Sequence, residues 1–185
     1  MTPSSWLACL ALVLCSVPQL TAQRHDPLTP PEIDQLRDTA VEPELRLKLY
    51  VKFARARLDS LEQMRSDPKT TGRAQKTHDQ LEDFLAVYDE LNDNIDTYLG
   101  RKDDIRKPLK AVIEADTEFQ AKLRALKNAA GTTSEEAKQY EFVLNNTLDT
   151  VDSSADDHRK LLAEQEEAAK HKKRTEKQDR SQRQE

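Results

Sequence analysis

Residues 81–100 read LEDFLAVYDELNDNIDTYLG. Apolar side chains recur in this stretch every three to four residues, which is the spacing of one face of an α-helix. The stripe consists of Leu81, Phe84, Leu85, Tyr88, Leu91, Ile95 and Tyr98. The pattern predicts a helix over about residues 73–99 that buries one face. Gly100 is predicted to end it, because glycine adopts the left-handed conformation that commonly follows a helix.

The same periodicity continues on both sides of this stretch. It predicts a short helix over about 30–40, a long one over about 44–65, a third that starts near Asp103 or Asp104, and a last one that starts within residues 132–134 and packs as far as Leu162. In the short helix, Thr29 and Glu32 have the spacing of a capping box, with prolines in the first turn.

Short connections between long helices favour antiparallel neighbours. The predicted fold class is therefore all-α: an elongated, coiled-coil-like up-down-up-down four-helix bundle, with a short extra N-terminal helix and a protruding charged C-terminal tail. A three-helix spectrin-like arrangement and an elongated dimer are the structural alternatives. The expected organisation is a flexible N-terminus over 23–29, a bundle domain over 30–163 and the tail over 164–185.

The N-terminal segment is predicted to be a signal peptide over residues 1–22. It has no charged side chain and carries an apolar run from Trp6 to Val17. That run is about 12 residues, whereas a membrane-spanning helix needs about 20. We expect cleavage after Ala22, a periplasmic or secreted protein, and no transmembrane segment after processing. Both cysteines, Cys9 and Cys15, lie in this segment, so the processed chain has no disulfide or thiolate site.

Composition narrows the function classes. The net charge of −5 argues against a dedicated nucleic-acid binder. Hydrophobic residues make up only 36% of the chain, so the apolar stripes are thin. Such stripes either close a slim bundle or are completed by a second copy, which keeps a homodimer open.

The sequence lacks the common motifs of catalysis and cofactor binding. Di-iron bundles need Glu-x-x-His pairs, but the residues three before His78, His158 and His171 are Gln75, Ala155 and Ala168. No Cys-x-x-Cys-His haem motif, nucleophile elbow, Ser-x-x-Lys pair or phosphate loop occurs. The sequence therefore predicts a protein that is not an enzyme and that has no cofactor and no metal site. A hydrolase that uses paired carboxylates is the residual alternative.

Two polar residues interrupt the apolar stripes. Asp116 occupies a heptad position, where a buried acid can fix helix register or pair with a facing Lys or Arg. His158 is the one imidazole on the last stripe, and it either bonds locally, senses pH or binds a ligand. Asp116 and His158 are thus a candidate interior polar site. An alternative function follows, in which the bundle encloses a small ligand or metal with help from Tyr50, Tyr88 and Tyr140.

The tail contains a cluster of cations after an acidic start. Its members are Lys170, Lys172, Lys173, Arg174, Lys177, Arg180 and Arg183. They are candidate contacts for a polyanion or a partner. The other interpretation is a frayed helix end whose cations suit the helix dipole. On the first interpretation, removal of the residues after Ala169 leaves the fold intact and lowers binding to anionic vesicles or polymers.

Taken together, these features favour an exported, non-catalytic helical protein that acts by binding in the cell envelope, as a scaffold, a chaperone-like factor or a stress-associated factor. The expected partner is an envelope protein or a cell-wall or lipid component.

Overall fold

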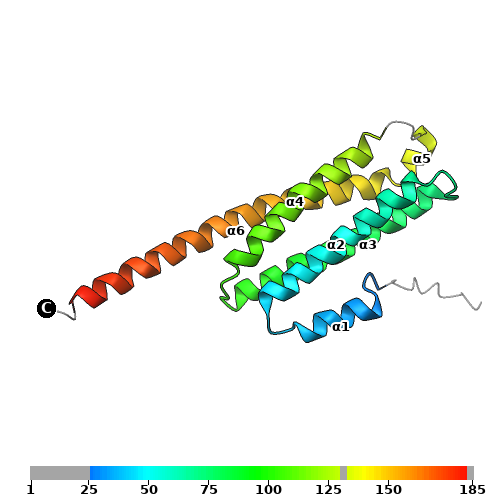
Figure 1. Ribbon diagram of the computed structural model, residues 1–185. Helices are drawn as coiled ribbons and strands as arrows, with labels where there is room; N and C mark the ends of the chain where they lie inside the picture. The colour runs from blue at the N-terminus through cyan, green and yellow to red at the C-terminus, as the bar shows by residue number, and fades with distance from the viewer. Residues whose placement is uncertain (1–25, 130–132, 183–185) are drawn as a thin grey trace, which may run out of the picture.

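The computed structural model describes residues 26–129 and 133–182, and these fold as helices joined by short connections (Figure 1). The predicted signal peptide, Gly131, Thr132 and Arg183 lie outside the described residues. The helices are α1 (Pro30–Asp38), α2 (Pro43–Ser66), α3 (Arg73–Gly100), α4 (Arg106–Lys127), α5 (Ser134–Lys138) and α6 (Glu141–Gln182). The all-α class is confirmed, and α2, α3, α4 and α6 run alternately up and down as predicted.

The neighbour relations differ from the expected ones in one place. Helix α2 packs against α3 and α4, and α6 packs against α4 and α3. Among the described elements α3 and α4 have no backbone contact, so these consecutive helices lie on a diagonal and not side by side. Five residues, 101–105, connect them. An extended segment of five residues spans at most about 17 Å, which exceeds the roughly 14 Å diagonal of a square of helices about 10 Å apart.

Large side chains fill the centre of this arrangement. Phe84 and Tyr88 of α3 and Phe119 of α4 are fully buried, with ring centroids 5.3–6.2 Å apart. Leucines continue the core toward both ends, among them Leu47, Leu81 and Leu109, all with no exposed area. The thin apolar stripes predicted from the sequence therefore pack together in one closed core, which lies on the diagonal between α3 and α4.

The end of α3 departs from the expected role of Gly100. Gly100 is the last helical residue, and the left-handed position belongs to Lys102, with φ of 62°. Lys102 N donates to Leu99 O at 2.9 Å, and Asp103 N donates to Tyr98 O at 3.0 Å. This is the hydrogen-bond pattern of a Schellman cap. The glycine thus precedes the left-handed residue by two positions, and α4 begins at Arg106, slightly later than predicted.

The last predicted helix is divided into α5 and α6. Thr133 Oγ1 accepts from Glu136 N at 3.1 Å, so one of the predicted N-caps is used. Gln139 N and Tyr140 N then bond to carbonyls three residues back, which interrupts the helix. The break allows Glu136 to pair with Arg65 at 3.1 Å and places the Tyr140 ring 5.4 Å from the same guanidinium. Tertiary contacts at this end of the bundle thus override local periodicity.

Helix α1 is fastened to α2 by the residue that caps it. Glu32 accepts a hydrogen bond from the Thr29 backbone N–H at 2.8 Å, which confirms the predicted capping interaction. The same carboxylate accepts from Arg57 at 2.6 Å, with both side chains mostly buried. One glutamate therefore begins α1 and also holds it against the bundle.

Candidate functional site

The end of α6 projects beyond the bundle. We call residues 163–182 of α6 the projecting arm; it extends past the ends of α3 and α4 (Figure 1). Leu161 and Leu162 are the last apolar side chains of α6 that pack against the core. Residues 170–178 are exposed throughout. The protruding charged tail is thus helical in the described residues and continuous with the bundle.

Polar contacts carry the packing slightly past Leu162, where the sequence predicted that it would stop. Gln165 accepts from Ile105 N at 3.3 Å and donates to Asp103 O at 3.2 Å. Glu166 pairs with Lys110 of α4 at 3.0 Å. These contacts fix the direction in which the projecting arm leaves the bundle.

Five of the predicted cations lie on one side of the arm. At about 100° per residue, they fall within an arc of about 120° and span about 15 Å along the axis. We call this set the cationic face: Lys170, Lys173, Arg174, Lys177 and Arg180. Glu176 lies about 100° from the centre of that arc. Helical geometry therefore converts a mixed charge run into a surface of one sign.

Of the other two predicted cations, Arg183 lies outside the described residues. Lys172 lies on the opposite side of the arm, and together with Lys173, Lys102 and Arg106 it lines a shallow cleft of about 460 Å³ beside the connection between α3 and α4. Arg106 is already paired with Asp104. The six predicted cations that the structure describes therefore do not all lie on one face of the arm.

An acidic side chain pairs with the cationic face at the end that is nearer to the bundle. Lys170 donates to Glu167 at 2.6 Å, and this hydrogen bond and the carboxylate charge raise the pKa of Lys170. In the described part of the chain, Lys173 and Arg174 have no ion pair. Lys173 and Arg174 thus present charges that a ligand can reach without breaking an ion pair among the described residues.

The predicted interior residues meet each other. His158 Nδ1 of α6 lies 2.8 Å from Asp116 Oδ2 of α4, and the Tyr88 hydroxyl of α3 donates to Asp116 Oδ1 at 2.8 Å. We call these three residues the interior triad. Asp116 and Tyr88 have no exposed area, and His158 is 4% exposed. The facing Lys or Arg considered for Asp116 is not its partner, because imidazole and phenol hydrogens satisfy both carboxylate oxygens.

Electrostatics keep the phenol protonated. Burial raises the pKa of Tyr88 most strongly, and the charge of Asp116 and its hydrogen bond raise it further. A phenol that holds its proton is a steady donor to the carboxylate. Tyr50 and Tyr140 lie elsewhere, beside Arg46 and Arg65 respectively. The structure therefore does not assemble the three tyrosines around Asp116 and His158.

A second cleft lies between the C-terminal halves of α2 and α4. Leu58, Leu61 and Leu123 line it together with Lys122 in a volume of about 460 Å³. Lys122 is paired with both Asp59 and Glu62, at 2.8 and 2.7 Å. This cleft has no signal in the sequence, because its lining comes from residues about 60 positions apart.

Comparisons with known proteins found no match to a family model, a curated protein or a solved structure. Over the ranges 26–129 and 133–182, none of the helices combines the length and apolar character that a bilayer span requires.

Proposed function

We propose that this protein is an exported, non-catalytic helical scaffold that attaches to phosphate-rich anionic surfaces of the cell envelope through the cationic face of its projecting arm. The observation that carries the proposal is the cationic face itself, a row of like charges on a straight helix that stands clear of the bundle. Export is expected from the N-terminal segment.

The chemistry of the arm favours peripheral binding. Beyond Leu162 its apolar residues are alanines, so it offers no side chain that would insert into a bilayer. A lysine or arginine near an anionic membrane contributes about 1 kcal/mol. Five such residues give on the order of 5 kcal/mol, which corresponds to a dissociation constant of roughly 0.2 mM. The proposed contact is thus reversible and weakens as salt rises.

The interior triad supports a structural role better than a binding role. Its polar atoms bond to one another and tie α3, α4 and α6 together. A guest ligand would have to displace these bonds, and this favours the exterior arm as the binding element.

The test is a vesicle co-sedimentation experiment on residues 23–185, with phosphatidylcholine vesicles that contain or lack phosphatidylglycerol. We expect binding only to the anionic vesicles, with loss of binding in Lys173→Glu/Arg174→Glu/Lys177→Glu and after removal of the residues beyond Ala169. The matched control is Lys52→Glu/Lys69→Glu/Lys76→Glu, which makes the same charge change at exposed positions of the bundle. Equal loss in the control would show a net-charge effect and overturn the role of the arm.

A second version of the experiment adds soluble inorganic polyphosphate as a competitor. Competition by polyphosphate would identify phosphate groups as the shared ligand chemistry, whereas vesicle binding that polyphosphate does not displace would identify a lipid surface. The location is tested separately: N-terminal sequencing of the native protein should begin at Gln23.

A further inference from the structure

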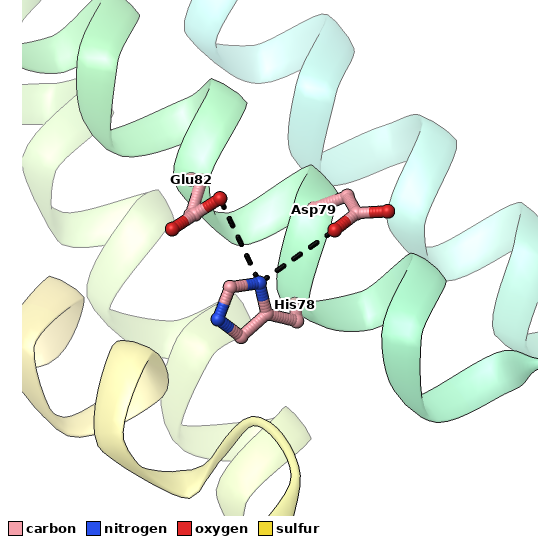
Figure 2. A group of neighbouring side chains, drawn as sticks. All are labelled: His78, Asp79 and Glu82. Carbon is pink, nitrogen blue, oxygen red and sulfur yellow. Dashed lines mark ion pairs between the residues drawn. The ribbon is translucent and has the colours of Figure 1, made fainter. Parts of the chain in front are cut away.

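A histidine and two carboxylates come together on the first half of α3. His78 Nδ1 lies 3.6 Å from an oxygen of Asp79 and 3.7 Å from an oxygen of Glu82 (Figure 2). One possible ligand atom from each of the three side chains lies within 4.8 Å of the ligand atoms of the other two. This group is at the far end of the bundle from the projecting arm, so it is independent of the proposed function (Figure 1).

The most informative feature of this group is the hydrogen bonding of the His78 imidazole. His78 Nδ1 is shielded from solvent, yet it has no hydrogen-bond partner among the described residues. Its distances to the two carboxylates are too long for hydrogen bonds, which are near 2.8–3.0 Å. Two atoms that ligate one tetrahedral zinc ion lie about 3.3 Å apart, given bonds of about 2.0 Å. The observed separations are therefore closer to those of metal ligands than to those of a hydrogen-bonded pair.

The surroundings orient the group. His78 and Glu82 are one helical turn apart and so share a face of α3. Gln75 Nε2 donates to Asp79 Oδ1 at 2.7 Å, and this is the oxygen that faces His78. Hydrogen bonds of this kind to ligating carboxylates are typical of the outer shell of metal sites. The carboxylates are more than half exposed, which leaves them free to rotate toward an ion.

We propose that His78, Asp79 and Glu82 form a binding site for a divalent transition-metal ion, with zinc as the reference ion. One imidazole and two carboxylates suit zinc, copper or nickel, whereas calcium and magnesium prefer oxygen ligands alone. Three protein ligands leave at least one coordination position for water or for a group from another molecule. The order of residues explains why the search for Glu-x-x-His did not detect the site: here the histidine precedes the glutamate by four positions.

The test is calorimetric titration of metal-free residues 23–185 with zinc chloride. We expect one saturable site per chain, loss of that site in His78→Ala and at least tenfold weaker binding in Glu82→Gln. Gln75→Ala should weaken binding about tenfold by releasing Asp79. Circular dichroism of each variant checks that the helices are retained.

His171→Ala is the matched control. His171 is also four positions from a glutamate, Glu167, but it is followed by a lysine and not by a carboxylate. Its removal should leave the zinc isotherm unchanged. Nitrogen-15 spectra of the histidine rings add a structural readout, because zinc on Nδ1 of His78 fixes the proton of that ring on Nε2 and changes the chemical shifts of both ring nitrogens.

Two outcomes would overturn the proposal. One is the absence of saturable zinc binding at millimolar concentration. The other is binding that His78→Ala leaves unchanged, which would place zinc on the general acidic surface. Vesicle binding through the arm is unaffected by either outcome, so this inference and the proposed function fail separately.

Discussion

At the scale of the residue, the interior triad shows how a buried acidic side chain is accommodated. Asp116 accepts one hydrogen bond at each carboxylate oxygen, from Tyr88 and from the His158 ring. A buried carboxylate that loses a donor keeps its full desolvation cost. The triad therefore restricts how α3, α4 and α6 can slide against one another.

Replacement of Tyr88 by phenylalanine should destabilise the protein. The change removes the donor to Asp116 Oδ1 while it keeps the ring in place, so we expect a loss of about 1–3 kcal/mol in the free energy of unfolding. Urea unfolding followed by circular dichroism measures it. Tyr98→Phe is the control, because the Tyr98 hydroxyl has no hydrogen bond among the described residues and its ring is equally buried. Equal losses in both variants would contradict a specific role for the Tyr88 hydroxyl.

Lys102 carries a backbone conformation that its side chain disfavours. Its φ of 62° is that of a Schellman cap, where glycine has no steric penalty. Lys102→Gly should therefore stabilise the protein by about 1 kcal/mol. Thermal unfolding measures the change. Gly100→Ala should also stabilise, by about 0.5–1 kcal/mol, because Gly100 is helical and an added Cβ meets nothing within 4 Å. Destabilisation by Lys102→Gly would mean that its side chain contributes more than the strain costs.

At the scale of the element, each of the two short helices is joined to the bundle by an ion pair. Helix α1 buries Leu36 and is held by the pair of Glu32 and Arg57. Helix α5 is held by the pair of Glu136 and Arg65. Where a helix has too few apolar residues to dock by burial, a mostly buried ion pair supplies the remaining specificity.

The attachment of α1 should depend on pH. Burial acts to raise the pKa of Glu32, but hydrogen bonds from Arg57 and Thr29 outweigh it, and the net pKa lies below 4.5. A carboxyl whose pKa is lower in the folded state contributes stability above its unfolded pKa, and this contribution is lost as the pH falls through the folded-state pKa. Glu32→Gln retains an acceptor for the Thr29 N–H but removes the charge.

We therefore expect Glu32→Gln to lower the free energy of unfolding by about 1–3 kcal/mol at neutral pH. The difference from the wild type should shrink as the pH falls below 4.5, the reference pKa of the carboxyl. Unfolding curves at a series of pH values measure it. Asp34→Asn, which changes an exposed acid of the same helix, is the control. A difference that does not depend on pH would exclude the ion pair as its cause.

At the scale of the whole molecule, stability is distributed unevenly along α6. Its first half packs against α4 and α3, whereas among the described residues no apolar side chain beyond Leu162 packs against the core. Local opening requires little free energy where few buried contacts break. We therefore expect the projecting arm to be locally less stable than the bundle.

Hydrogen exchange should reveal this gradient. Amides of residues 143–158 should exchange at the rate of global unfolding, and those of residues 170–182 should exchange much faster. Mass spectrometry of peptides from residues 23–185 measures both. Anionic vesicles should slow exchange in the arm alone if the arm binds them. Uniform protection along α6 would show that other residues, from this chain or from a second molecule, cover the arm.

Much of this molecule follows from local pattern. Apolar spacing predicted the four long helices, and the Thr29 and Glu32 pair predicted the start of α1, because periodicity and capping act within one turn. The same logic identified Asp116 and His158 as polar positions on apolar stripes, and it located the cations of the tail.

Tertiary structure decided which of these elements meet. A connection of five residues permits α3 and α4 to be either neighbours or diagonal partners, and core packing selected the diagonal. That arrangement places Tyr88 and His158 against the two carboxylate oxygens of Asp116. Helical spacing tells which residues share a face, but contact between faces depends on how side chains from distant parts of the chain fill a common core.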